Sequence, residues 1–171
     1  MRTDRTYRPL ALAAALAATL LGTAPAAAQE TDLGFRGWGL RAGAASDPDQ
    51  AIVGVHWDLG ELLEDLRLQP SVDLGFGDDV ATFSLLVPVH YRFEIASDVT
   101  PYAGGGLLLA VLDRDDPPRG RGRDDEEDFD IAPVAVGGLE IPIGRGRDLL
   151  LELHLGGGDA FDAKFVAGWS F

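Results

Sequence analysis

The sequence predicts an all-β fold: an eight-stranded antiparallel up-and-down transmembrane β-barrel with a polar, filled interior, preceded by a cleaved signal peptide. Three observations support this prediction. Residues 161–171 alternate up to the last residue, residues 1–28 have the pattern of an export signal, and no later segment is apolar for long enough to form a spanning helix. Because backbone polar groups must be satisfied within hydrocarbon, residues 29–171 would enter a membrane only as a closed barrel.

The C-terminal segment has one apolar face that begins and ends with an aromatic. This row comprises Phe161, Ala163, Phe165, Ala167, Trp169 and Phe171. The residues between them, including Asp162 and Lys164, are predicted to face the lumen. A transmembrane strand needs about 9 to 11 residues, an apolar face toward lipid and aromatics at both interfaces. We therefore expect an aromatic girdle here.

Residues 1–28 are predicted to be a cleaved signal peptide. Three arginines precede a short apolar stretch at residues 10–21, and alanines at residues 26–28 supply small side chains before the expected cleavage site. The apolar stretch is shorter than the roughly 20 residues of a spanning helix, which argues against an uncleaved anchor. Residues 29–171 are then a single outer-membrane barrel domain.

Composition limits the class of protein. Removing residues 1–28 leaves 143 residues, which suits one barrel or sandwich. The chain has 14 basic and 28 acidic residues, and the removed segment holds three arginines and one aspartate, so the formal charge of the remainder is −16. This charge argues against nucleic acid as a partner, because phosphate binding needs clustered Lys and Arg. The absence of cysteine excludes disulfides, thiolate metal sites and cysteine nucleophiles.

The first four predicted strands are residues 35–45, 50–59, 66–76 and 80–94. In each of them apolar side chains alternate with polar or small ones, the pattern of a strand with one apolar face. The apolar rows include Trp38, Val53, Val72 and Val87. The opposite rows contain Arg41, His56, Asp58, Arg67, Asp73, His90, Arg92 and Glu94.

The other four predicted strands are residues 99–112, 129–143, 148–155 and 161–171. The first is apolar on both sides around three glycines, so its pattern does not fix the lipid-facing side. In the others, the polar rows contain Glu140, Glu152, His154, Asp162 and Lys164. Prolines at positions 70, 88, 101, 133 and 142 each remove a ladder donor, which is the weakest point of the assignment. A single helical turn is expected at residues 60–66.

The ionisable residues of the polar rows are predicted to form one network in the lumen. An eight-stranded barrel has an interior just wide enough for side chains to fill. Charged groups persist in such an interior only when they are paired and hydrogen-bonded. The sequence therefore predicts a plugged, salt-bridged interior with no open pore.

Four short segments resemble a known family. They are Pro-Tyr-Ala-Gly-Gly-Gly at 101–106, Gly-Gly-Leu-Glu at 137–140, Leu-Leu-Leu-Glu-Leu at 149–153 and Gly-Trp-Ser-Phe at 168–171. The chain resembles the small outer-membrane β-barrel family, which includes eight-stranded proteins similar to the OmpA transmembrane domain and OmpX. The resemblance implies an outer-membrane location, contact with outer-membrane lipid, and an assembly signal at Phe161, Trp169 and Phe171 for the barrel-assembly machinery. It implies no reaction, since members include structural proteins, adhesins and a few lipid-modifying enzymes.

The connection at residues 113–128 contains eight acidic and four basic residues. Its composition predicts a solvated, mobile loop, and its length places it on the outer side of a barrel whose ends lie in the periplasm. Two alternatives stay open. The acidic run at 124–128 would hold a divalent cation only weakly, because it lacks the spacing of a calcium loop. The arginines at 119, 121 and 123 would instead meet lipopolysaccharide phosphates at the cell surface.

The histidines are the remaining candidates for chemistry. His56, His90 and His154 are predicted to lie in the lumen beside carboxylates, where a structural role is favoured because a filled barrel has no access path. No Ser–His pair is expected on the lipid face, and no known catalytic motif occurs. We therefore expect a non-enzymatic barrel with a structural or surface-interaction role, without cofactor or metal. The alternatives are a lipid-modifying barrel enzyme and an exported soluble barrel that binds a ligand, the latter with apolar side chains inside.

Overall fold

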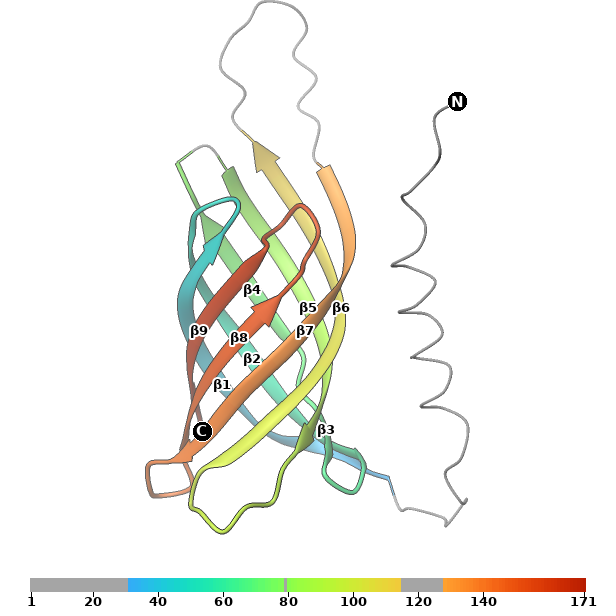
Figure 1. The fold of residues 1–171 in the computed structure, drawn as a ribbon, viewed down its shortest axis with the longest axis vertical. Helices are drawn as coiled ribbons and strands as arrows, with labels where there is room; N and C mark the ends of the chain where they lie inside the picture. Colours follow the sequence, from blue (N-terminus) through green and yellow to red (C-terminus); the bar gives the residue numbers. More distant parts are fainter. Residues whose placement is uncertain (1–30, 79, 115–127) are drawn as a thin grey trace, which may run out of the picture.

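The computed structural model describes residues 31–78, 80–114 and 128–171, which form one closed antiparallel sheet (Figure 1). Its strands are β1 (Asp32–Ser46), β2 (Gln50–Leu63), β3 (Leu66–Leu68), β4 (Ser71–Phe76), β5 (Val80–Arg92), β6 (Thr100–Arg114), β7 (Asp128–Pro142), β8 (Asp148–Leu155) and β9 (Ala163–Ser170). The sheet closes because β1 pairs with both β2 and β9. The proposed signal peptide lies outside the described residues.

Strands β3 and β4 together make one wall element of the barrel. Both pair with β2 on one side and with β5 on the other. They are separated at Gln69 and Pro70, where the Pro70 carbonyl still accepts a hydrogen bond from the Trp57 amide at 2.9 Å. The predicted continuous strand at 66–76 is interrupted because proline has no amide hydrogen to donate to the ladder. With this pair counted once, the predicted eight-stranded barrel is confirmed.

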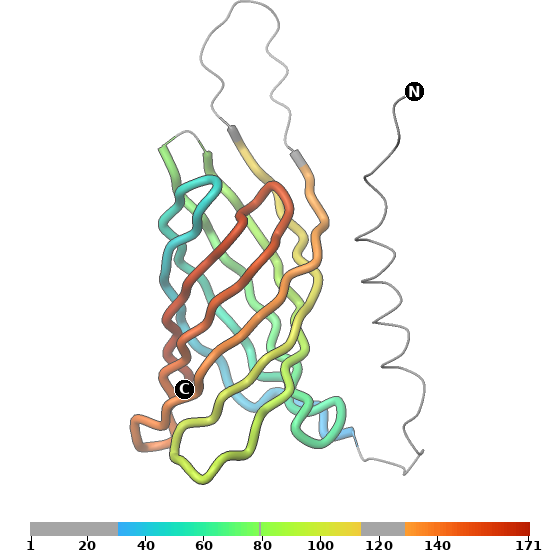
Figure 2. The backbone as a smooth tube through the Cα atoms, viewed as in Figure 1, coloured from blue at the N-terminus to red at the C-terminus, as the bar shows by residue number. Residues whose placement is uncertain are grey.

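The barrel has two distinct ends (Figure 2). At one end, here called the terminal rim, β1 begins, β9 ends, and turns connect β2 to β3, β5 to β6 and β7 to β8. At the other end, the loop rim, β1 is joined to β2, β4 to β5 and β8 to β9. The end of β6 and the beginning of β7 also lie at this rim. The helical turn expected at residues 60–66 is wrong, because β2 continues to Leu63 and the chain reverses at Glu64 and Asp65, with Asp65 at φ 62°.

The last strand begins two residues later than its alternation predicts. Phe161 and Asp162 precede β9 in the connection from β8, where the Asp162 amide donates to the Ser46 carbonyl at 3.0 Å. Phe161 is 3% exposed and lies inside the barrel, with the Lys164 ammonium 4.7 Å from its ring centroid. The prediction that Phe161 belongs to the outer aromatic girdle is therefore wrong. Asp162 is exposed instead of facing the lumen.

The outer face of the barrel is apolar and carries aromatics toward both rims. Near the terminal rim they are Trp38, Trp57, Tyr91, Phe93, Trp169 and Phe171, and near the loop rim they are Phe76, Phe83 and Phe129. Phe171 closes the β1–β9 seam, since its amide donates to the Trp38 carbonyl at 2.8 Å and the two rings lie 5.2 Å apart. Two aromatic rows around an apolar band are the pattern of a transmembrane barrel. Within the described ranges there is no helix of sufficient length and apolarity to span a membrane.

The interior changes character along the barrel axis. Toward the loop rim it holds an apolar plug, which comprises Ala45, Ile52, Leu108, Ala110, Leu112, Val134, Ala160 and Phe161. Leu108 and Leu112 are fully buried. From the middle of the barrel to the terminal rim the interior is charged. The sequence predicts the charged part and not the plug, because the phase of residues 99–112 is ambiguous in the pattern.

Candidate functional site: the charged interior

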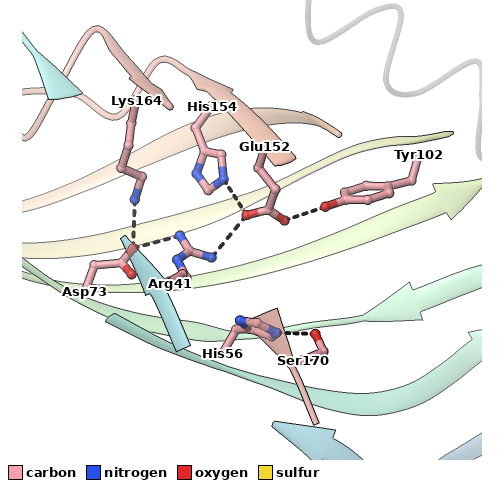
Figure 3. A network of polar contacts seen from close by, with 8 residues as sticks. All are labelled: Arg41, His56, Asp73, Tyr102, Glu152, His154, Lys164 and Ser170. Atoms are coloured by element: carbon pink, nitrogen blue, oxygen red, sulfur yellow. Dashed lines mark hydrogen bonds and ion pairs between the residues drawn. The ribbon is translucent and has the colours of Figure 1, made fainter. Parts of the chain in front are cut away.

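A buried aspartate is the centre of the first interior cluster (Figure 3). One carboxylate oxygen of Asp73, Oδ2, accepts from Arg41 Nη2 at 2.8 Å and from Lys164 Nζ at 2.8 Å. The three side chains come from β4, β1 and β9, and each is less than 5% exposed. Asp73 thus links β4 to the neighbouring strands β1 and β9, with neither of which β4 pairs in the sheet.

Glu152 on β8 extends this cluster toward the opposite wall. Its carboxylate accepts from Arg41 Nη1 at 3.2 Å and from the Tyr102 hydroxyl at 2.9 Å, and its Oε2 lies 3.0 Å from His154 Nε2. The ring of His90 stacks on that of Tyr102 with centroids 5.0 Å apart. Figure 3 shows Arg41, Tyr102 and His154 converging on Glu152. Their fixed geometry stabilises the barrel interior as a connected unit.

A second cluster lies nearer the terminal rim. Arg67 pairs with Asp58 at 3.0 Å and with Glu140 at 2.9 Å, and Arg92 approaches Glu140 at 3.6 Å. These side chains are more exposed than those around Asp73, with Arg67 at 16% and Arg92 at 28%. The cluster therefore faces water at the barrel mouth while the first cluster is enclosed.

The interior charges balance. In the described ranges the two clusters contain the cations Arg41, Arg67, Arg92 and Lys164 and the carboxylates Asp58, Asp73, Glu140 and Glu152. Removing charges from water is costly unless each finds a partner and its remaining polar atoms are satisfied. A balanced, cross-linked set meets much of this requirement and fills the space that a pore would need.

A serine and a histidine that are far apart in sequence also meet in the lumen. His56 Nε2 and Ser170 Oγ lie 2.9 Å apart. The imidazole occupies the space beside Gly39, where an added Cβ would lie 2.3 Å from His56 Cε1. Glycine is required at that position because the ring and the backbone of β9 both approach it closely. The sequence places both side chains on inner faces, but their contact depends on strand register.

A cavity of about 110 Å³ opens at the terminal rim below this pair. It is lined by Arg36, Trp38, His56, Asp58, Arg67, Gln69, Glu140, Asp148, Leu150, Ser170 and Phe171, together with two glycines. Its walls carry charged groups of both signs. The cavity is large enough for a few water molecules or one small solute.

The structure brings together most of the residues predicted for the lumen. Arg41, Asp73, Glu152, His154 and Lys164 belong to the central cluster, and Asp58, Arg67, Arg92 and Glu140 to the cluster near the terminal rim. His56 and His90 are buried as well. Glu94 is the exception besides Asp162: β5 ends at Arg92, and Glu94 is exposed in the following turn. The prediction that Glu94 lies in the lumen is wrong, because alternation continues past the point where the strand ends.

The metal and surface-partner hypotheses concern groups of acidic side chains and the connection at 113–128. In residues 31–78, 80–114 and 128–171 there is no group of three or more His, Asp or Glu side chains arranged to hold a metal ion. Most of the connection at 113–128, with its acidic run and arginines, lies outside the described residues. A cation or surface partner there therefore remains a hypothesis from composition.

Two solved structures are similar to the chain in fold. The crystal structure of Neisserial surface protein A has a TM-score of 0.59 at 16% identity, covering 78% of this chain and 93% of that one. The crystal structure of the N-terminal β-barrel domain of OprF from Pseudomonas aeruginosa has a TM-score of 0.56 at 14% identity, covering 80% and 96%. Both are eight-stranded outer-membrane barrels.

The chain has the eight-stranded outer-membrane barrel fold. The match covers nearly the full length of both structures. Neither a protein-family model nor a curated protein sequence matches the chain. At these identities the likeness concerns the fold, so the function has to be argued from the surfaces and interior of this barrel.

Proposed function

We propose that residues 29–171 form an integral outer-membrane barrel with no open pore, exported by a signal peptide at residues 1–28, whose role is structural or is exerted through its loop rim. The observation that carries the proposal is the inversion of polarity. Phe83, Leu107 and Phe165 are at least 50% exposed on the outer face, whereas Asp73 and Lys164 are buried inside. Such a surface is stable in hydrocarbon and unstable in water.

This polarity also separates the proposal from an exported soluble barrel that binds a ligand. Such a carrier has apolar side chains around an internal cavity and polar side chains outside. Here the cavity at the terminal rim is lined mainly by polar groups, and the apolar plug is filled by its own side chains. The apolar outer face and the polar cavity therefore both argue against an exported soluble barrel that binds a ligand.

A lipid-modifying enzyme is the second alternative, and the position of the Ser–His pair argues against it. Lipid chemistry needs a nucleophile and base that reach the hydrocarbon or a headgroup at the outer face. His56 is 2% exposed and its ring, with Ser170, lies on the inner side of β2 and β9. The His56 Nδ1 atom has no hydrogen-bond partner in the protein, so no carboxylate orients the ring as in a catalytic triad.

The proposed role at the loop rim is tested by replacing residues 115–127 with a Gly–Ser linker of equal length. We expect unchanged assembly, since the replacement leaves β6, which ends at Arg114, and β7, which begins at Asp128, intact. We also expect loss of cell-surface binding in a screen against host or matrix components. Assembly is read from heat-modifiable migration of the unboiled protein in detergent. Equal surface binding by cells with the wild-type protein and cells with the linker variant would contradict a role for this segment. The structural role would then be the one supported.

Contact with the barrel-assembly machinery is proposed at the C-terminal strand. Phe171→Lys is expected to reduce the amount of folded barrel in the outer membrane severalfold, because it removes the terminal aromatic at the β1–β9 seam. Phe35→Lys is the matched control, since Phe35 is 67% exposed in β1, outside the last strand. Quantitative blotting of boiled and unboiled membranes measures the outcome. Equal loss in both variants would point to general lipid-face damage and contradict a terminal signal.

A further inference from the structure

The two parts of the interior differ in their access to water. In the apolar plug, Leu108 and Leu112 are fully buried and Ala110 is 1% exposed. Members of the plug lie at the loop rim itself, since Leu112 is two residues before the end of β6 and Ala45 is one residue before the end of β1. Thr82 and Ser84 are buried beside these residues, but the apolar side chains of the plug are packed without exposure and leave little room for water. The plug therefore separates the charged interior from the loop rim.

The terminal rim is different, because unpartnered polar atoms there line a cavity. His56 Nδ1 and Arg67 Nε are buried without a hydrogen bond to the protein, and both residues line the cavity of about 110 Å³. Gln69 lines the same cavity. Buried polar atoms without partners are costly, and solvent or a small solute with donors and acceptors satisfies them. The cavity is thus chemically suited to small polar molecules.

We propose that the terminal rim opens into a dead-end vestibule, which takes small neutral molecules carrying both hydrogen-bond donors and acceptors, such as amides, and that the apolar plug stops them from passing further. The ligand's acceptor would meet Arg67 Nε, and its donors would meet the carboxylates of Asp58 or Glu140 on the same wall. Access extends up to His56 and Ser170 and ends below the Asp73 cluster. The vestibule itself does not depend on the proposed function. Only the compartment that it opens to rests on the proposed outer-membrane location.

Single cysteines test the vestibule directly, because the natural chain contains none. Ser170→Cys and Gln69→Cys place a thiol on the cavity wall, Ala110→Cys places one in the plug, and Ala96→Cys provides an exposed reference. The purified, folded barrels are treated with iodoacetamide, a small neutral amide. The thiolate displaces iodide and forms a thioether, and mass spectrometry follows the extent of alkylation over time.

We expect the two vestibule cysteines to react within about tenfold of the reference and Cys at 110 to react roughly a hundredfold more slowly, since a packed site reacts only after local opening. Heat-modifiable migration establishes that each variant is folded, and the second vestibule position serves if the first variant does not fold. Rapid alkylation at position 110 would overturn the plug. Slow alkylation at both positions 69 and 170 would overturn the vestibule.

A further comparison distinguishes this proposal from the proposed membrane location. Alkylation of detergent-solubilised barrels reports access to the cavity regardless of which membrane the protein occupies. If the protein is absent from the outer-membrane fraction but the cysteine of Ser170→Cys is alkylated as expected, the proposed membrane location is rejected and the vestibule is supported. If the protein is found in the outer-membrane fraction but the cysteines at positions 69 and 170 are protected from alkylation, the location is supported and the vestibule is rejected.

Discussion

Asp73→Ala is expected to lower the free energy of unfolding of the barrel by about 3 to 5 kcal/mol, because it leaves two buried cations without their shared partner. Arg41 and Lys164 both donate to the same oxygen of Asp73, and all three side chains are less than 5% exposed. Arg41 keeps a contact to Glu152, but Lys164 has no other carboxylate within ion-pair distance among the described residues. Urea-induced unfolding in lipid vesicles measures the loss.

The matched control for Asp73→Ala is Asp32→Ala. Asp32 pairs with Arg36 at the start of β1, but its side chain is 79% exposed, so its loss is expected to cost about 1 kcal/mol or less. Equal, small losses in the two variants would mean that the Asp73 cluster is hydrated. That result would contradict the enclosed, salt-bridged interior.

Leu107→Arg is expected to destabilise the barrel by about 2 to 4 kcal/mol, the cost of a cation near the bilayer midplane. Leu107 lies at the middle of β6, is 57% exposed on the outer face, and pairs with Val87 and Pro133. Its neighbours along the strand are equally apolar, so an arginine here has no nearby polar atom of the protein to reach. The same unfolding assay applies, with refolding into vesicles to establish reversibility.

A rim position controls for the presence of arginine itself. Ile143 is 45% exposed just beyond the end of β7 at the terminal rim, where an arginine reaches water, so Ile143→Arg is expected to cost about 0 to 1 kcal/mol. On a soluble barrel both substitutions would be nearly neutral, as surface changes usually are. A difference close to zero between the two variants would therefore contradict burial of the outer face in lipid.

Alternation in the sequence predicts most of the fold because a transmembrane strand must keep one face for lipid and one for the lumen along its whole length. The rule holds for β2, β5 and β8, whose polar rows lie inside as predicted. It fails at Phe161. The sequence pattern alternates there, but the chain is still in the bend between β8 and β9, because β9 begins only at Ala163. Gly156, Gly157 and Gly158 all have positive φ, which lets the chain turn Phe161 inward over Lys164.

The partners inside the barrel could not be predicted from the sequence. Arg41 and Asp73 lie on strands that are not neighbours in the sheet, and His56 and Ser170 are 114 positions apart. Such contacts depend on strand register, which is set by the whole closed sheet. The apolar plug is also missed, because residues 107–112 are apolar on both faces and only the pairing of β6 with β5 and β7 decides which side faces in.

The native tryptophans test the central claim, that the outer face lies in lipid, without any substitution. All three, Trp38, Trp57 and Trp169, lie on the outer face near the terminal rim. Their fluorescence is measured after folding into vesicles of ordinary or brominated phosphatidylcholine. We expect strong quenching by the brominated lipid and weak quenching by acrylamide in the water phase. Strong acrylamide quenching with no effect of bromine would contradict the account.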